Sequence, residues 1–462
     1  AVGGVVRRRA RGRAAAVARH AASGRQVGVI GSGPIGLYAA HQLVKEGHSV
    51  TLFERASAVA GNVRSWGFVR LFSQLDLNVP TAVLATLEAQ GCSVPALTEF
   101  ITGDDFVAKV LEPLAEWLKA SGKCELKLGC EVLGIGRGRF LKSDAIAATG
   151  DKRRIGKPFR VVFRDTASGK EAAEVGFQAM VDASGSYNAA TGNRVGVGGL
   201  AAPGERDAEA CGKLRRIIPD VKGADQQLVA GRRVAVIGTG YSAITCLRNL
   251  CDLAKQGGQG APSEVFWLTR SPASKMPYSI MENDPLPQRS ELAKFGNQFV
   301  NTSGNAENPW GSTKFEYVPA MAITAIEQES PDGCLRLALE LGEDGDKERH
   351  IEVDALVSLT GFHPDKEMWS EIQVHMCYAS DGPMKLASSL LAAKLAMEGD
   401  PAAAGDCLSQ AAPGPQTLLN PEPDFYVLGM KSYGRNSTFL MRVGYEQVDL
   451  LMEQLKQDGS SN

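Results

Sequence analysis

Strand-like apolar runs and helix-like apolar spacings alternate along most of this chain. Near its start they predict a strand, a helix and a second strand, at residues 26–30, 37–46 and 49–53. The same order returns later, with a strand, a helix and a strand predicted at residues 234–237, 243–255 and 264–268. This alternation indicates parallel sheets with helices on both faces, so the predicted fold class is α/β.

A glycine-rich turn joins the first strand to its helix in both groups. The two turns read Gly31-Ser-Gly-Pro-Ile-Gly36 and Gly238-Thr-Gly-Tyr-Ser-Ala243. Gly31 permits a tight turn, Gly33 lets the backbone approach a pyrophosphate, and Gly36 allows close packing of helix on strand. The fingerprint tolerates Ala243 at the third position. Because helix N-termini attract anions, each turn predicts a dinucleotide site.

The residue that ends the second strand differs between the two groups. Glu54 ends the first, where a carboxylate can accept hydrogen bonds from ribose hydroxyls. Thr269 and Arg270 end the second, and an arginine there suits a 2′-phosphate. The second site therefore favours NADPH over NADH, unless Arg270 is simply a solvated loop residue.

These features resemble the two-dinucleotide-binding-domain flavoproteins over most of residues 26–456. The resemblance implies FAD at the first site, NADPH at the second, and two Rossmann-like domains with the NADPH domain inserted into the FAD domain. Asp182-Ala-Ser-Gly185 and Thr360-Gly-Phe-His-Pro-Asp365 are similar to the connectors that mark the domain crossings. The expected parts are a basic tail at 1–25, the FAD domain at 26–230 and 356–462, and the NADPH domain at 231–355.

A closer resemblance is to the flavin-containing (class B) monooxygenases. Ala60-Gly-Asn-Val-Arg-Ser-Trp66 resembles their Gly-Gly-x-x-x-x-Trp stretch, with Ala60 in place of the first glycine. The identifying Phe-x-Gly string with a histidine is absent, and Val195 to Glu205 stands in its place. The resemblance implies that NADPH reduces FAD, and that a flavin peroxide formed with molecular oxygen oxygenates nitrogen or sulfur in a small substrate.

Two residues are candidates for catalysis under this resemblance. Asn78 resembles the active-site asparagine of the family, in a similar Phe-Ser-x-x-x-x-Asn setting, although it can equally be a loop or helix-cap residue. Trp66 can supply an apolar wall beside the flavin. The predicted cofactor-binding residues are Gly31, Gly33, Pro34, Ile35, Gly36, Glu54, Arg55, Asn62, Trp66, Ser184, Gly185, Gly238, Gly240, Tyr241, Ser242, Ala243, Thr269, Arg270, Thr360, Gly361 and Gly429.

Other functions remain open from the residues alone. The main alternative is an NADPH-dependent flavin reductase or dehydrogenase that passes electrons to a quinone or a protein. A non-catalytic sensor of NADPH is a third possibility. A disulfide reductase is disfavoured, because such an enzyme needs a redox-active cysteine pair. The closest pair in this chain, Cys246 and Cys251, is five residues apart on a predicted helix, so the two side chains point to different faces. Both are expected to be core thiols.

Charge and composition exclude several classes. The net charge of −2 gives no case for nucleic acid, and no apolar run reaches the roughly 18–20 residues that span a bilayer. No histidine or cysteine spacing predicts a metal. Residues 1–25 contain seven arginines and no acid, which is typical of an organelle transit peptide or a disordered extension. A cytoplasmic or organellar location follows.

Two further basic segments have open interpretations. Residues 136–158 contain Arg137, Arg154 and five other basic residues, which predicts a solvated surface insertion or, alternatively, a binding patch. Near the C-terminus, Gly429 can let the backbone approach the flavin. Lys431, Arg435 and Asn436 can then place donors near its ring, or they can cap the last helix and face solvent.

Overall fold

The computed structural model describes residues 24–281, 284–303, 309–328, 330, 333–342, 345–397 and 412–460. Most of the predicted basic tail therefore lies outside the described residues. The chain divides into two compact units. The first unit combines the chain up to Arg64 with Gln74–Ser186 and the chain from Pro364, and the second unit combines Ser65–Ser73 with Tyr187–His363.

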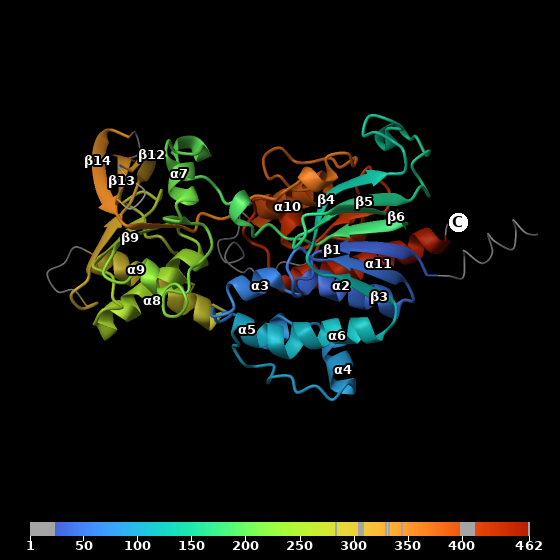
Figure 1. Cartoon of the computed structure of the whole chain (residues 1–462), viewed down its shortest axis with the longest axis horizontal. Helices are drawn as coiled ribbons and strands as arrows, with labels where there is room; N and C mark the ends of the chain where they lie inside the picture. The colour runs from blue at the N-terminus through green and yellow to red at the C-terminus, as the bar shows by residue number, and fades with distance from the viewer. Residues whose placement is uncertain are drawn as a thin grey trace, which may run out of the picture. The chain divides into compact units, whose positions relative to one another are not determined.

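The first unit is built on a parallel sheet of five strands in the order β16-β7-β1-β2-β3. These strands are β1 (Gln26–Ile30), β2 (Ser49–Phe53), β3 (Cys124–Lys127), β7 (Ala179–Asp182) and β16 (Phe425–Val427). A second, antiparallel sheet consists of β4 (Cys130–Arg137), β5 (Phe159–Asp165) and β6 (Glu171–Phe177). The helices are α2 (Pro34–Lys45), α3 (Gly61–Ser65), α4 (Thr81–Ala89), α5 (Gly103–Phe106), α6 (Glu112–Ala120), α10 (Met384–Met397) and α11 (Met441–Ser460) (Figure 1).

Strand alternation sorts the first unit into three layers. Ile30 and Phe53 pack with Phe159 and Val161 of the antiparallel sheet in one buried cluster. Because neighbouring side chains point to opposite faces, Val29 lies on the other face of the sheet. On that side α2 is in contact with both α6 and α11. The parallel sheet is thus covered on both faces, as its near-continuous apolar strands require.

The second unit repeats this plan. Its parallel sheet has the order β11-β10-β9-β15-β8, and its antiparallel sheet has the order β12-β13-β14. The strands are β8 (Leu214–Arg215), β9 (Arg233–Ile237), β10 (Glu264–Leu268), β11 (Lys314–Val318), β12 (Met321–Gln328), β13 (Leu335–Leu341), β14 (Lys347–Val353) and β15 (Ala355–Ser358). The helices are α7 (Glu205–Ala210), α8 (Tyr241–Gln256) and α9 (Pro287–Thr302).

The same alternation operates in β9. Val234 and Val236 pack with buried residues of α8, whereas Ala235 and Ile237 pack with the antiparallel sheet. Each unit is therefore a parallel Rossmann-like sheet between helices and a three-stranded antiparallel sheet. The predicted α/β class with two Rossmann-like units is confirmed.

The limits of the second unit differ from the predicted domain limits of 231 and 355. The unit begins at Tyr187 because α7 and β8 belong to it, and β8 pairs with β15 through Leu214 and Leu356. Residues 65–73 also join it, and the rings of Phe72 and Tyr241 lie 5.6 Å apart. A two-residue strand leaves too short a pattern in the sequence to be recognised.

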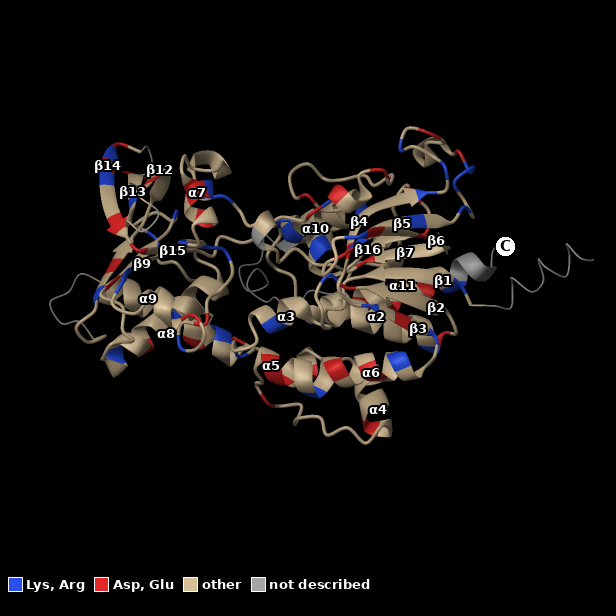
Figure 2. Ribbon diagram, viewed as in Figure 1, with Lys and Arg blue, Asp and Glu red and all other residues tan. Residues whose placement is uncertain are grey.

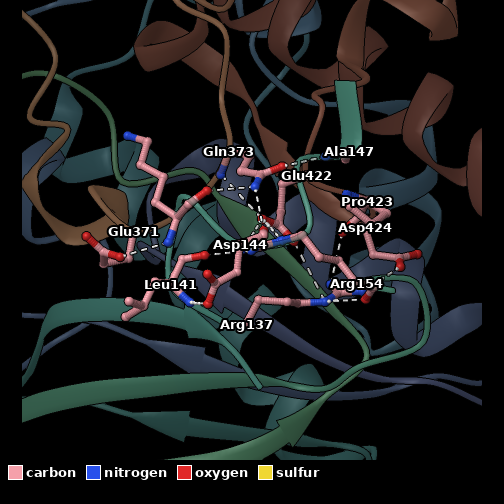
Figure 3. Close-up of polar contacts among 11 residues, drawn as sticks. Arg137, Leu141, Asp144, Ala147, Arg154, Glu371, Gln373, Glu422, Pro423 and Asp424 are labelled. Atoms are coloured by element: carbon pink, nitrogen blue, oxygen red, sulfur yellow. Dashed lines mark hydrogen bonds and ion pairs between the residues drawn. The ribbon is translucent and has the colours of Figure 1, made fainter. Parts of the chain in front are cut away.

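The basic segment between β4 and β5 is not a freely solvated insertion, so that interpretation is wrong in part. Arg137 and Arg154 are 1% and 0% exposed. Arg154 forms an ion pair with buried Glu422, and Arg137 forms one with Asp424 (Figure 3). Distant acids just before β16 therefore decide the burial of these two cations, and the local run of charge could not reveal it.

No helix within the described ranges is long and apolar enough to cross a bilayer.

Candidate functional site

Two glycines of the first glycine-rich turn are required by the packing of the chain itself. Gly31 has a φ of +92°, and a Cβ there would lie 2.7 Å from the Cα of Ser184. A Cβ on Gly36 would lie 1.8 Å from the Gly31 carbonyl oxygen. These positions agree with a tight turn and a close helix–strand contact.

Gly33 has no such requirement. Its φ of −71° suits any residue, and no atom of the described chain lies within 4 Å of a Cβ built there. It immediately precedes α2, whose first residue is Pro34 and whose first N–H groups lack helical partners. The open space beside Gly33 at this helix start fits the pyrophosphate of a dinucleotide.

Glu54 stabilises this turn directly. One carboxylate oxygen accepts hydrogen bonds from the Ser32 backbone N–H (2.8 Å) and hydroxyl (2.6 Å). The other accepts from the Ala56 N–H at 2.8 Å, which leaves it capacity for a further donor. The ribose contact of Glu54 stays a prediction. Sequence reasoning missed Ser32, although a small polar residue between the two glycines was a usable signal.

The remaining predicted residues of the first unit lie around this turn in different settings. Ile35, in the first turn of α2, contacts Gly429, where a Cβ would lie 3.3 Å from an Ile35 side-chain carbon. Gly429 has a φ of +70°, and its N–H donates to the Gln447 side chain. Arg55 and Asn62 are exposed. The C-terminal segment around Gly429 thus reaches the start of α2.

A buried ion pair lies at the end of β7, whose last residue is Asp182. The Lys431 ammonium is 2.7 Å from the Asp182 carboxylate and donates to the Ser184 hydroxyl at 3.0 Å. Trp369 donates to the same carboxylate at 2.8 Å. Burial by itself raises the pKa of Asp182, but the Lys431 charge and the hydrogen bonds from Lys431 and Ser184 hold that pKa below its ordinary value. Ser184 is exposed above this pair, at the carboxyl edge of the sheet.

The two catalytic candidates fall in different units. Asn78 is buried, caps a short 3-10 helix at Leu75–Leu77, and donates to the Gln74 carbonyl at 2.6 Å. Its own carbonyl accepts from the Tyr445 hydroxyl at 2.8 Å. These contacts favour the helix-cap interpretation of Asn78. Trp66 is half-buried in the 65–73 segment of the second unit. Catalytic roles for both stay predictions.

The second glycine-rich turn repeats the geometry of the first. Gly238 has a φ of +119°, and a Cβ there would lie 2.5 Å from the Leu359 carbonyl oxygen. Gly240 has a φ of −71°, and only that oxygen, at 4.0 Å, is near its Cβ position. Tyr241 and Ser242 open α8, and Ala243 is fully buried. Gly240 is therefore the counterpart of Gly33.

The other predicted residues of the second unit lie at the carboxyl ends of its strands. Thr269 is buried after β10, with its hydroxyl 3.0 Å from that of Tyr317. Arg270 is exposed next to it. After β15, the Thr360 hydroxyl donates to the Asn193 carbonyl at 3.1 Å, and Gly361 has a φ of +87°. An exposed Arg270 at this edge is free to approach a 2′-phosphate.

The cysteines of α8 are core thiols, as predicted. Cys246 and Cys251 are both 0% exposed, and burial raises the pKa of Cys246 to about 12. A thiol with so high a pKa is a poor nucleophile at neutral pH. Among the residues that the structure describes, no group of three or more histidine, cysteine, aspartate or glutamate side chains is arranged to hold a metal.

A family model described as an NAD(P)-binding Rossmann-like domain matches residues 29–98. The small chain of NADPH glutamate synthase from Bacillus subtilis is 36% identical over 86 residues, which cover 18% of this chain and 17% of that protein. The corresponding small chain from Mycobacterium tuberculosis is 52% identical over 42 residues, 9% of each protein. The chain thus matches less than a fifth of the length of these relatives.

Solved structures resemble both units together. Bacillithiol disulfide reductase Bdr (YpdA) from Bacillus cereus has a TM-score of 0.61 at 15% identity, over 95% of this chain and all of that one. Thioredoxin reductase from Lactococcus lactis has a TM-score of 0.55 at 14% identity, over 95% and 100%. These likenesses establish the fold. The matched family model describes a domain that binds NAD(P), which agrees with the geometry of the first glycine-rich turn.

Proposed function

We propose that this chain is an FAD- and NADPH-dependent oxidoreductase that oxygenates a small nitrogen- or sulfur-containing substrate. The observation that carries the cofactor part is the pair Gly33 and Gly240. Each lies at the start of a Rossmann helix, with an ordinary φ and no close neighbour at its Cβ position. Neither strain nor packing requires a glycine at these two positions, and a ligand lying close to the backbone would require one.

In the first unit, the N–H groups at the start of α2 would bind the pyrophosphate of FAD. Glu54 orders the turn through Ser32 and keeps acceptor capacity for a ribose hydroxyl. The Asp182–Lys431 pair holds the crossing segment that carries Ser184. When bound, FAD accepts a hydride and passes electrons onward, chemistry that no side chain supplies.

In the second unit, the start of α8 would bind the pyrophosphate of NADPH, with Arg270 available for its 2′-phosphate. An arginine paired bidentately with a phosphate prefers NADPH over NADH, because NADH leaves the guanidinium without its partner. The chain therefore supplies binding, orientation and cofactor preference in both units.

The choice of acceptor rests on two observations. The stretch from Ala60 to Trp66 resembles a flavin-containing monooxygenase sequence. The buried Cys246 and Cys251 are unsuited to disulfide exchange, although similar structures carry disulfide or thioredoxin reductase names. Both observations favour an acceptor other than a disulfide, and oxygenation is the proposal that also uses the sequence resemblance. Electron transfer to a quinone or a protein is the rival.

Purified protein should contain FAD that NADPH reduces faster than NADH does. With a panel of small amines and thioethers, oxygen uptake should match NADPH consumption and an oxygenated product should form. The rival reductase would be established by two results together: turnover with a quinone in the absence of oxygen, and no oxygenated product when the assay is run in air. A chain that binds no flavin under any condition would refute the whole assignment.

A further inference from the structure

The loop between β4 and β5, residues 138–158, is here named the basic excursion. Its exposed basic residues outnumber its two acids, in a chain whose net charge is −2 (Figure 2). These basic residues are Arg139, Lys142, Lys152, Arg153 and Lys157. Arg153 pairs with Asp151, and the other four form no ion pair with any residue that the structure describes. The basic excursion therefore presents uncompensated positive charge.

The basic excursion also exposes aliphatic side chains. Leu141 is 63% exposed, Ile155 is 54% exposed and Ile146 is 47% exposed. Large aliphatic side chains grouped among cations on one loop are unusual for a surface that only meets water. They supply apolar area that a partner can bury.

Buried anchors fix the backbone that carries these side chains. Arg154 donates to the carbonyls of Leu141 (3.0 Å) and Asp144 (3.1 Å), and pairs with Glu422 at 2.6 Å (Figure 3). Gln373 donates to the Lys142 carbonyl at 2.7 Å and accepts from the Ala147 N–H at 2.9 Å. Leu141, Ile146 and Ile155 are thus each next to an anchored residue, so the surface is ordered before any partner binds.

This surface lies away from the first glycine-rich turn. Glu422 and Asp424 immediately precede β16, at the amino end of the parallel sheet, whereas Gly31 and Gly33 follow the carboxyl end of β1. Arg25, just before β1, pairs with Asp424 at 3.1 Å. A partner bound to the basic excursion therefore leaves the first glycine-rich turn uncovered.

We propose that the basic excursion is a docking surface for the anionic headgroups of a lipid bilayer. Membrane-surface segments combine aliphatic side chains with lysine and arginine, and polybasic segments gain affinity from each cation near anionic lipid. Protein interfaces instead favour aromatic residues and are depleted of lysine. Three of the five exposed cations here are lysine, and the exposed apolar residues are aliphatic. A lipid surface fits this chemistry better than an acidic protein.

The charge test uses the full chain and phosphatidylcholine vesicles with or without phosphatidylserine. Wild-type protein should cosediment with the anionic vesicles only, and less so at high salt. The triple variant K142Q/K152Q/K157Q should lower the partition coefficient about tenfold or more. The matched control K170Q/K347Q/K385Q removes the same charge from exposed positions elsewhere and should bind normally. FAD content and the circular dichroism spectrum should be unchanged in both variants.

The aliphatic test separates lipid from other anions. Leu141→Ser with Ile155→Ser should weaken vesicle binding severalfold, whereas Val175→Ser, at a 65% exposed position on β6, should not. Absence of wild-type binding, or binding that neither set of variants changes, would overturn the proposal. Charge dependence without aliphatic dependence, together with equal binding to polyglutamate, would overturn it in favour of an acidic protein partner.

Discussion

The carboxylate of Asp182 and the ammonium of Lys431 lie 2.7 Å apart, and both side chains are at most 1% exposed. Removing one partner of such a pair strongly destabilises the folded protein, because the other partner stays charged in the interior. Asp182 ends β7 and Lys431 follows β16, so their contact joins β7 to the segment after β16. This relationship makes the crossing at Ser184 dependent on the C-terminal part of the chain.

Lys431→Met should cost about 3–5 kcal/mol of unfolding free energy at neutral pH, measured by urea denaturation. The wild-type pair keeps the pKa of Asp182 below its ordinary 3.8, so its stabilising contribution is present above that pH and is lost on further acidification. In the variant, burial raises the pKa of Asp182, so the acid becomes neutral more easily. The stability gap to wild type should narrow as the pH falls from 7 to roughly 5. A constant gap would contradict this account, and Asp182→Asn with Lys431→Met should recover part of the loss.

Gly33→Val should give a folded protein without bound FAD. Beyond the two neighbouring residues, a Cβ at position 33 has no described atom within 4 Å, and the added side chain would occupy the space assigned to the pyrophosphate. The absorbance of bound flavin and the melting temperature of apoprotein measure the two effects separately. Gly240→Val is the reciprocal control, which should keep FAD and lose NADPH binding. A yellow Gly33→Val protein with full flavin content would disprove the first site.

Arg270→Ala should raise the Michaelis constant for NADPH roughly 10- to 150-fold, since a charge-assisted hydrogen bond contributes about 1.5–3 kcal/mol. The constant for NADH should stay nearly the same, because NADH has no 2′-phosphate. Steady-state kinetics with both nucleotides provides the measurement. Equal losses with both would show that Arg270 supports the fold instead.

Arg154→Ala should destabilise the first unit by about 3–5 kcal/mol, since buried Glu422 then loses its closest cation and keeps Arg137 at 3.8 Å. Arg153→Ala is the matched control one residue away, where the side chain is exposed and pairs with Asp151 at the surface. That control should unfold at nearly the wild-type urea concentration. Similar urea midpoints of unfolding for both variants would mean that the buried hydrogen-bond and ion-pair network of Figure 3 contributes little to stability.

The roles of the turn glycines could be predicted because they depend on local backbone geometry. Gly31, Gly36 and Gly238 are required by φ or by a neighbour that the strand–turn–helix pattern itself brings close. The sequence also predicted the strand–helix–strand succession around each glycine-rich turn. These features depend on residues within one supersecondary unit, where spacing along the chain determines spacing in the fold.

The missed features depend on partners far along the chain. Arg154 and Glu422 are 268 positions apart, so nothing near Arg154 indicated its burial. Ser184 and Lys431 are 247 positions apart, which left solvent exposure of Lys431 open as an alternative, and burial of Lys431 excludes it. Asn78 shows the reverse case. Its side chain donates to the Gln74 carbonyl, four residues away, so its role as a cap could be anticipated.

The two parallel sheets take one edge strand, β16 in the first unit and β8 in the second, from different places in the chain. This difference affects folding during synthesis. The second unit takes β8 from the segment before β9, so all its strands have emerged once β15 is made. The first unit takes β16 from beyond the insertion. Since domains fold as they leave the ribosome, the inserted unit can complete its folding first. Asp182 lacks its ion-pair partner until Lys431 has been synthesised. A nascent chain that stops before β16 should therefore hold a folded second unit and a first unit whose parallel sheet still lacks its edge strand.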